Sequence, residues 1–171
     1  MKKYIGLVLV AMSGCILTVN AQQSFSYKNP LLPTELRVND LLGRMTLEEK
    51  IAQIRHLHSW DVFDGQILNQ EKLDKMCGGI GYGFFEGFPL TAASCRKTFR
   101  EIQTYMVEKT RLGIPGFPVA ESLHGVVHEG TTIYPQNIAM GSTFNPELAY
   151  EKTKHIAGEL NTMGVKQVLA P

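Results

Sequence analysis

The chain has 171 residues, of which 44% are hydrophobic and 19% charged, and its formal net charge is +1. This is the composition of a globular protein, and it excludes a disordered chain. Seventeen basic and sixteen acidic residues create no long-range field, which excludes a nucleic-acid partner recognised through charge.

The N-terminus has the features of a secretory signal peptide over residues 1–21. Two lysines form a basic start, an apolar stretch follows to Val19, and small residues precede a cleavage site after Ala21. The stretch is short for a membrane anchor, and no later stretch could span a bilayer. We therefore expect a secreted or periplasmic protein. The alternative is a lipoprotein anchored through Cys15.

Helices are predicted after a polar lead at residues 22–35. Thr34 can cap a first helix, and Gly43 marks the expected joint to a second one. Thr46 and Glu49 have the spacing of a capping box, in which each side chain bonds the other residue's amide. The second helix has one apolar face at helical spacing, formed by Leu47, Ile51 and Ile54.

The middle of the chain alternates between strand and helix signals. Residues 58–76 are rich in loops, with a short helix near 70–76, and the glycine-rich apolar run 78–85 predicts a buried strand. Thr91 begins a long helix for which Gly113 is the expected C-cap, followed by a strand at 116–120.

The last third of the chain repeats this alternation. Asn145 and Pro146 have the residue types of a helix start, and the helix is expected to run to Met163 and end at Gly164. Residues 165–171 then predict a third strand. Alternating strands and helices indicate a parallel α/β sheet, for which an open doubly wound sheet and a (β/α)8 barrel are both possible. A complete barrel needs about 250 residues.

Two cysteines remain after the expected cleavage. Cys77 and Cys95 fit no zinc-binding spacing, and we interpret them as buried free thiols, although one disulfide between them is a possible alternative.

The segment VAESLHGVVHEG, residues 119–130, concentrates ionisable groups. A metal site formed by Glu121, His124 and His128 is disfavoured, because Gly125 interrupts the helix that such spacing needs. Glu121 directly follows a predicted strand, at the edge of a parallel sheet where ligands bind. A carboxylate at this edge can accept hydrogen bonds from paired hydroxyl groups, which is the chemistry of sugar recognition.

Four sequence blocks closely resemble the start of glycoside hydrolase family 3, in order and at similar spacing. They are RVNDLLGRMTLEEKIAQI (37–54), TRLGIPGFPVAESLHGV (110–126), TTIYPQNIAMGSTFNPEL (131–148) and GVKQVLAP (164–171). The resemblance implies that residues 36–171 form the first three β/α units of an incomplete TIM-like (β/α)8 barrel. It also implies a retaining, exo-acting enzyme that removes terminal β-linked sugars, of which glucose is the expected one. The implied chemistry needs no metal or organic cofactor.

The resemblance implies site roles residue by residue. Glu121 matches an acidic position that binds sugar hydroxyls, although many members have Asp there. His124 and Gly125 match residues that shape the loop, and no catalytic role is carried over to His128 or Glu129. The family's nucleophile, acid/base and other sugar-binding motifs are absent from this sequence.

We therefore expect the chain alone to be inactive, with the remaining barrel and a second domain as its partners and an oligosaccharide as substrate. One alternative is a degenerate remnant that only binds glycans. Another is an unrelated open α/β sheet with a different function.

Overall fold

The computed structural model describes residues 26–87 and 91–170, in two compact units, 1–43 and 44–171. The expected signal peptide and its lipoprotein alternative lie outside the described residues. In the first unit a 3-10 helix, η1 (Ser26–Lys28), is tied to helix α1 (Thr34–Arg44). The Tyr27 amide donates to Asp40 Oδ2 at 2.9 Å, and Arg37 Nε donates to the Tyr27 carbonyl at 2.9 Å.

Helix α2 (Leu47–Ala52) begins at the predicted capping box, which is confirmed. The Glu49 amide donates to Thr46 Oγ1 at 3.2 Å, and the Thr46 amide donates to Glu49 Oε2 at 2.8 Å. Gly43 lies within α1, and the joint falls after Arg44, so its expected position was wrong by a few residues.

The apolar face predicted for this helix is exposed rather than buried. Leu47, Ile51 and Ile54 are 68%, 47% and 78% exposed, whereas Glu49 and Ala52 are buried. Glu49 is held by Arg111, whose Nε donates to Oε1 at 2.8 Å and whose Nη2 donates to Oε2. Arg111 Nη2 also donates to the Arg44 carbonyl at 2.8 Å, so Arg111, in the loop after a later helix, holds both the segment before α2 and the first turn of α2.

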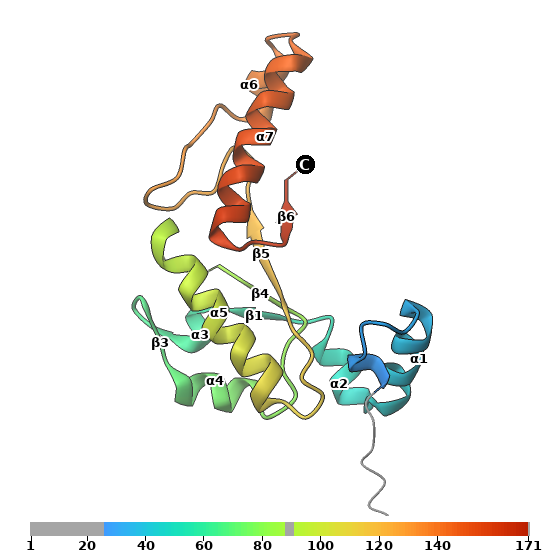
Figure 1. Ribbon diagram of the computed structural model, residues 1–171. Coiled ribbons are helices and arrows are strands. Elements are labelled where there is room, and N and C mark those ends of the chain that lie inside the picture. The colour runs from blue at the N-terminus through green and yellow to red at the C-terminus, as the bar shows by residue number, and fades with distance from the viewer. Residues whose placement is uncertain (1–25, 88–90, 171) are drawn as a thin grey trace, which may run out of the picture. The chain divides into compact units, whose positions relative to one another are not determined.

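The second unit contains a four-stranded parallel sheet in the order β1-β4-β5-β6 (Figure 1). The strands are β1 (His56–His58), β4 (Phe84–Glu86), β5 (Phe117–Glu121) and β6 (Gln167–Leu169). The sequence predicted three strands and missed β1, because its three residues, His-Leu-His, do not lie in an apolar run. The parallel α/β class is confirmed, and within the described residues the sheet is open rather than closed into a barrel.

Helices connect successive parallel strands. Between β1 and β4 lie α3 (Ser59–Val62), a small hairpin of β2 (Phe63–Asp64) and β3 (Ile67–Leu68), and α4 (Gln70–Cys77). Helix α5 (Ala92–Lys109) connects β4 to β5, and α6 (Asn137–Gly141) with α7 (Pro146–Met163) connects β5 to β6. None of the helices in the described ranges is long and apolar enough to cross a membrane.

The glycine-rich run is a turn for most of its length, contrary to the strand predicted at 78–85. Gly78 is the left-handed C-cap of α4, with φ of 54°, and Gly79 and Gly81 also have positive φ. Only the last two residues of the run belong to β4. Gly83 fits because a Cβ there would lie 1.9 Å from the Gln53 carbonyl oxygen.

The boundaries of the later helices differ in accuracy. Helix α5 has Thr91 as its N-cap, as predicted, but it ends at Lys109 because Thr110 turns to an extended backbone. The expected C-cap at Gly113 was therefore wrong. Helix α7 is confirmed at both ends, with Asn145 as N-cap and Gly164 as a left-handed C-cap.

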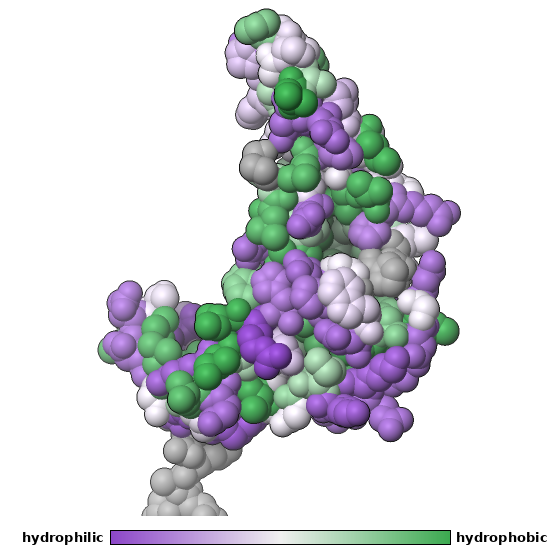
Figure 2. All heavy atoms as spheres, turned by 180° about the vertical axis from the view of Figure 1, so that it is seen from behind, coloured by the Kyte–Doolittle hydropathy of each residue, from purple (hydrophilic) through white to green (hydrophobic). Residues whose placement is uncertain are grey.

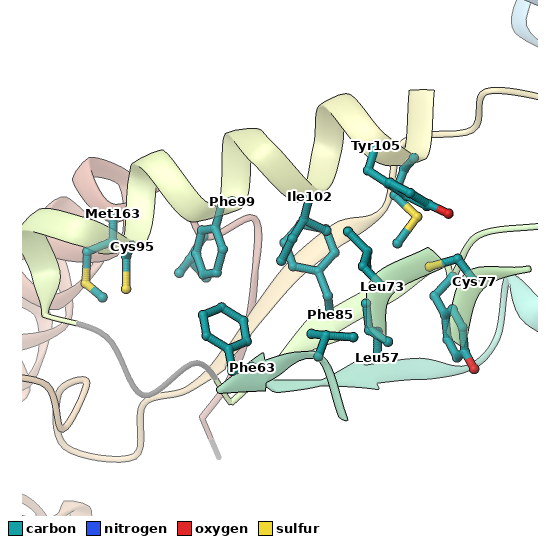
Figure 3. Close-up of a cluster of buried hydrophobic side chains, with 14 of the residues drawn as sticks. Leu57, Phe63, Leu73, Cys77, Phe85, Cys95, Phe99, Ile102, Tyr105 and Met163 are labelled. Atoms are coloured by element: carbon teal, nitrogen blue, oxygen red, sulfur yellow. The ribbon is translucent and has the colours of Figure 1, made fainter. Parts of the chain in front are cut away.

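The core lies between the sheet and helices α4, α5 and α7. Figure 3 shows Phe99, Ile102 and Tyr105 pointing from α5 toward Leu57 and Phe85 on the strands. Phe85 and Phe99 meet edge to face, with ring centroids 5.5 Å apart, which is a favourable aromatic geometry. Burying large apolar side chains here fixes which face of the sheet meets the helices.

Several large apolar side chains remain exposed outside this core. Phe117 is 55% exposed, and Val168 and Leu169 on the edge strand β6 are 43% and 39% exposed. Apolar residues, in green, are visible at the surface of the face drawn in Figure 2. The described part of the chain thus leaves an edge strand and part of one sheet face without cover.

Candidate functional site

Glu121 is the last residue of β5 and pairs in register with Leu169 of β6. The sequence predicted that Glu121 directly follows the strand, whereas in the structure it is the last residue of the strand. Its side chain is exposed at the C-terminal edge of the parallel sheet. In sheets of this type ligands bind at this edge, because the loops that follow the strands converge there.

Backbone hydrogen bonds hold the loop after Glu121, both to the neighbouring strand β6 and within the loop itself. The Ser122 amide donates to the Leu169 carbonyl at 3.0 Å, and the Tyr134 amide donates to the His124 carbonyl at 2.8 Å. Gly125 has φ of 105°, and a Cβ there would lie 2.3 Å from the Thr132 carbonyl oxygen. A side chain at this position would therefore open the loop.

The two histidines of the loop occupy different environments. His124 is half-buried, and its Nδ1 has no hydrogen-bond partner among the described residues. The backbone near His128 is held by Thr131, whose hydroxyl donates to the His128 carbonyl at 2.8 Å. Glu129 is exposed, and its carbonyl accepts from the Ala92 amide at 2.9 Å. No group of three metal-ligating side chains suited to an ion occurs in the described ranges.

A pocket of about 420 Å³ opens beside Glu121. Its walls combine the C-terminal ends of β1, β4 and β5 with the loop that carries His128. The polar and aromatic side chains of its lining are His58, Trp60, Glu86, Glu121 and His128. Its apolar lining includes Val119, Phe99 and Met163. A pocket lined by apolar side chains with a few convergent polar groups is the usual form of a small-molecule site.

The sequence analysis did not single out three of these lining residues, which are His58, Trp60 and Glu86. His58 and Glu86 lie at the ends of β1 and β4, which are register partners. Glu86 Oε1 is 3.3 Å from His58 Nδ1 and 3.1 Å from His56 Nδ1. Neither contact has hydrogen-bond geometry, so each is a close approach of a carboxylate oxygen to an imidazole nitrogen. The signal that could have revealed β1 is the alternation His-Leu-His.

The cysteines are buried free thiols, as predicted. Burial raises the pKa of Cys77 to about 12, with a further contribution from the charge of Asp74, and burial raises the pKa of Cys95 to about 11. Thiols with such pKa values are poor nucleophiles at neutral pH. Cys95 lines the pocket but is therefore not a reactive group in it.

Comparisons with known proteins bear on this site. The family model described as the glycosyl hydrolase family 3 N-terminal domain matches residues 46–171. A Formosa agariphila protein assigned as a β-xylosidase is 30% identical over 87% of this chain and 20% of its own length. The periplasmic β-glucosidase of Salmonella typhimurium is 26% identical over 99% of this chain and 20% of its own.

A solved structure agrees with these relatives. A β-glucosidase from Erythrobacter marinus superposes with a TM-score of 0.70 at 26% identity, covering 88% of this chain and 20% of that one. The chain spans about a fifth of the length of the curated relatives named here. Because the family model covers most of the chain, including the whole four-stranded sheet, the chain belongs to glycosyl hydrolase family 3 and contains sequence of its N-terminal domain.

Proposed function

We propose that this chain is part of an exported retaining glycosidase that removes terminal β-D-glycosyl residues from the non-reducing ends of oligosaccharides. Glucose is the first candidate for the sugar that is removed. The observation that carries the proposal is the position of Glu121. It lies at the ligand-binding edge of a parallel sheet, in a pocket of about 420 Å³, within a segment that matches the family. Export is supported by the basic and apolar N-terminus and by the similarity to the periplasmic β-glucosidase of Salmonella typhimurium.

Glu121 is proposed to hold sugar hydroxyls rather than to react. An ionised carboxylate offers two acceptor oxygens, and hydrogen bonds to charged groups are stronger than those between neutral groups. The exposed side chain of Glu121 is accessible to a ligand in the pocket. His124 and Gly125 are proposed to shape the loop, since the Gly125 backbone approaches Thr132 too closely for any side chain.

The bond-breaking groups are proposed to lie in other parts of the enzyme. A retaining glycosidase needs a nucleophilic carboxylate and an acid/base about 5–5.5 Å apart, which together form and hydrolyse a glycosyl-enzyme intermediate. The family motifs for this pair are absent from the sequence. The 171-residue chain by itself is therefore proposed to bind but not to cleave.

A second candidate substrate is a terminal β-xylosyl residue. It is favoured by the Formosa relative, which is the more similar of the two curated proteins. It also suits the side chain at position 121, because Glu is one methylene longer than the Asp that many family members carry. A pentose lacks the exocyclic hydroxymethyl group of glucose and so leaves space for the longer carboxylate.

Hydrolysis of aryl β-glucosides and aryl β-xylosides tests the proposal. The chain joined to the remainder of a family 3 enzyme is expected to cleave one of them, whereas the 171-residue chain is expected to cleave neither. Glu121→Gln should lower kcat/KM by roughly 10- to 100-fold, the loss of a charge-assisted hydrogen bond. Glu129→Gln, an exposed glutamate on the same loop, is the matched control and should change little. Equal activity of both variants would contradict the role of Glu121.

A further inference from the structure

Four side chains form a polar cluster beside Glu121, on β1, β4 and α3. Glu86 Oε1 lies between the Nδ1 atoms of His56 and His58, at 3.1 and 3.3 Å. The Trp60 ring is stacked on His58, with centroids 4.3 Å apart and an interplanar angle of 8°. Contacts between neighbouring side chains therefore connect Glu86 on the sheet to the exposed indole of Trp60.

Strand register places this cluster on the same sheet face as Glu121. Glu86 pairs with His58 on one side and with Val119 on the other, and Glu121 is two residues beyond Val119. Residues two apart on a strand share a face and are separated by roughly 6–7 Å along it. Phe85, between Phe84 and Glu86, points instead into the core toward α5 (Figure 3).

We propose that Glu86 and Trp60 form a second sugar-binding wall of this pocket, beside Glu121 on the same face of the sheet. The inference deepens the proposed function and rests on it. Both histidine contacts go to Oε1 of Glu86, so Oε2, which takes part in neither of them, can accept a sugar hydroxyl. His56 and His58 are positioning residues, because their close approach limits where the Glu86 carboxylate can lie.

Trp60 supplies the apolar part of this wall. Its residue surface is 68% exposed although one side of the ring is stacked on His58. The face of an aromatic ring carries partial negative charge, and the C–H groups on one face of a pyranose carry partial positive charge. An exposed indole at the rim, beside two carboxylates, therefore matches a pyranose that presents hydroxyls at its edge and C–H groups on its face.

The emission of Trp60 tests this inference directly, because it is the only tryptophan of the 171 residues. Methyl β-D-xyloside and methyl β-D-glucoside are titrated into the 171-residue chain, up to high millimolar concentration. At least one of them is expected to change the emission saturably. Glu86→Gln should raise the dissociation constant about tenfold, because it replaces a charged acceptor by a neutral one of the same shape.

Two controls separate binding from folding. Glu71→Gln alters an exposed glutamate on α4, outside the pocket, and should leave the titration unchanged. Trp60→Ala removes the probe, so its binding is followed by calorimetry beside Tyr150→Ala, whose side chain on α7 is similarly exposed at 66%. Circular dichroism of every variant shows whether it keeps the helix content of the parent chain.

The outcomes distinguish this inference from the proposed function. If neither glycoside changes Trp60 emission, or if Glu86→Gln binds like Glu71→Gln, the inference is overturned. If Glu121→Gln alone weakens binding, Glu121 keeps its role while the second wall is rejected. The proposed function itself is decided by hydrolysis in the longer enzyme, which does not depend on Trp60 emission.

Discussion

The ion pair between Glu49 and Arg111 is expected to stabilise the start of the family 3 segment. Glu49 is 4% exposed and accepts from the Thr46 amide and from two nitrogens of Arg111. The perturbation is Glu49→Ala, which removes all three hydrogen bonds together with the buried charge. Arg111 itself stays half-exposed, with 54% of its side chain accessible, so water can solvate it once its partner is gone.

The magnitude follows from these contacts. Losing the capping interaction costs about 1 kcal/mol. Losing the charge-assisted pair with a half-exposed guanidinium costs about 1–2 kcal/mol, less than the about 3–5 kcal/mol for a fully buried pair. The sum, about 2–3 kcal/mol, corresponds to a change of roughly 30- to 150-fold in a local opening equilibrium.

Hydrogen exchange of the α2 amides, followed by mass spectrometry over residues 46–53, measures this opening equilibrium without assuming two-state unfolding. Amide exchange in Glu49→Ala should be roughly 30- to 150-fold faster than in the parent chain. Glu101→Ala, which removes an exposed i,i+4 partner of Lys97, is the control and should change exchange little. A double-mutant cycle with Arg111→Met isolates the pair interaction.

The pH dependence gives a second test. The hydrogen bonds from Arg111, together with that from Thr46, outweigh burial and hold the pKa of Glu49 below its ordinary value of 4.5. A lowered folded-state pKa means that the stabilisation is present above about pH 4.5 and is lost as the pH falls through the folded-state pKa. The ratio of variant to parent exchange rates should therefore shrink at low pH. A ratio near one at pH 7, or one that stays constant on acidification, would refute the reasoning.

Two further predictions concern packing. Gly83→Ala places a Cβ against the Gln53 carbonyl oxygen and should destabilise the chain by about 2 kcal/mol or more in thermal melts followed by circular dichroism, whereas Gly158→Ala, with open space around it in α7, should be neutral or stabilising. A stable Gly83→Ala chain would show that β4 can move away from α2. In a Cys15→Ser background, Cys77 and Cys95 should resist a thiol reagent at pH 8 until denaturant is added, because burial raises both pKa values. Rapid labelling of the native chain would contradict their burial.

The sequence predicted the elements that carry strong local signals. The capping box at Thr46, the α5 start at Thr91 and both ends of α7 lie where the residue types require, because caps depend on hydrogen bonds within four residues. Local signals failed where distant residues decide. The apolar face of α2 is exposed because the buried position is taken by Glu49, whose partner Arg111 is 62 residues away in sequence.

The sequence by itself determined the family, the parallel α/β class and Glu121 as the candidate sugar-binding residue. Those depend on the order of motifs and on a strand end, which are linear features. Only the tertiary structure decided that Glu121 shares a pocket with His58, Trp60 and Glu86. His58, Glu86 and Glu121 end three strands whose pairing depends on crossover connections, and Trp60 lies on the helix that follows β1, so no local pattern in the chain indicates that the four residues meet.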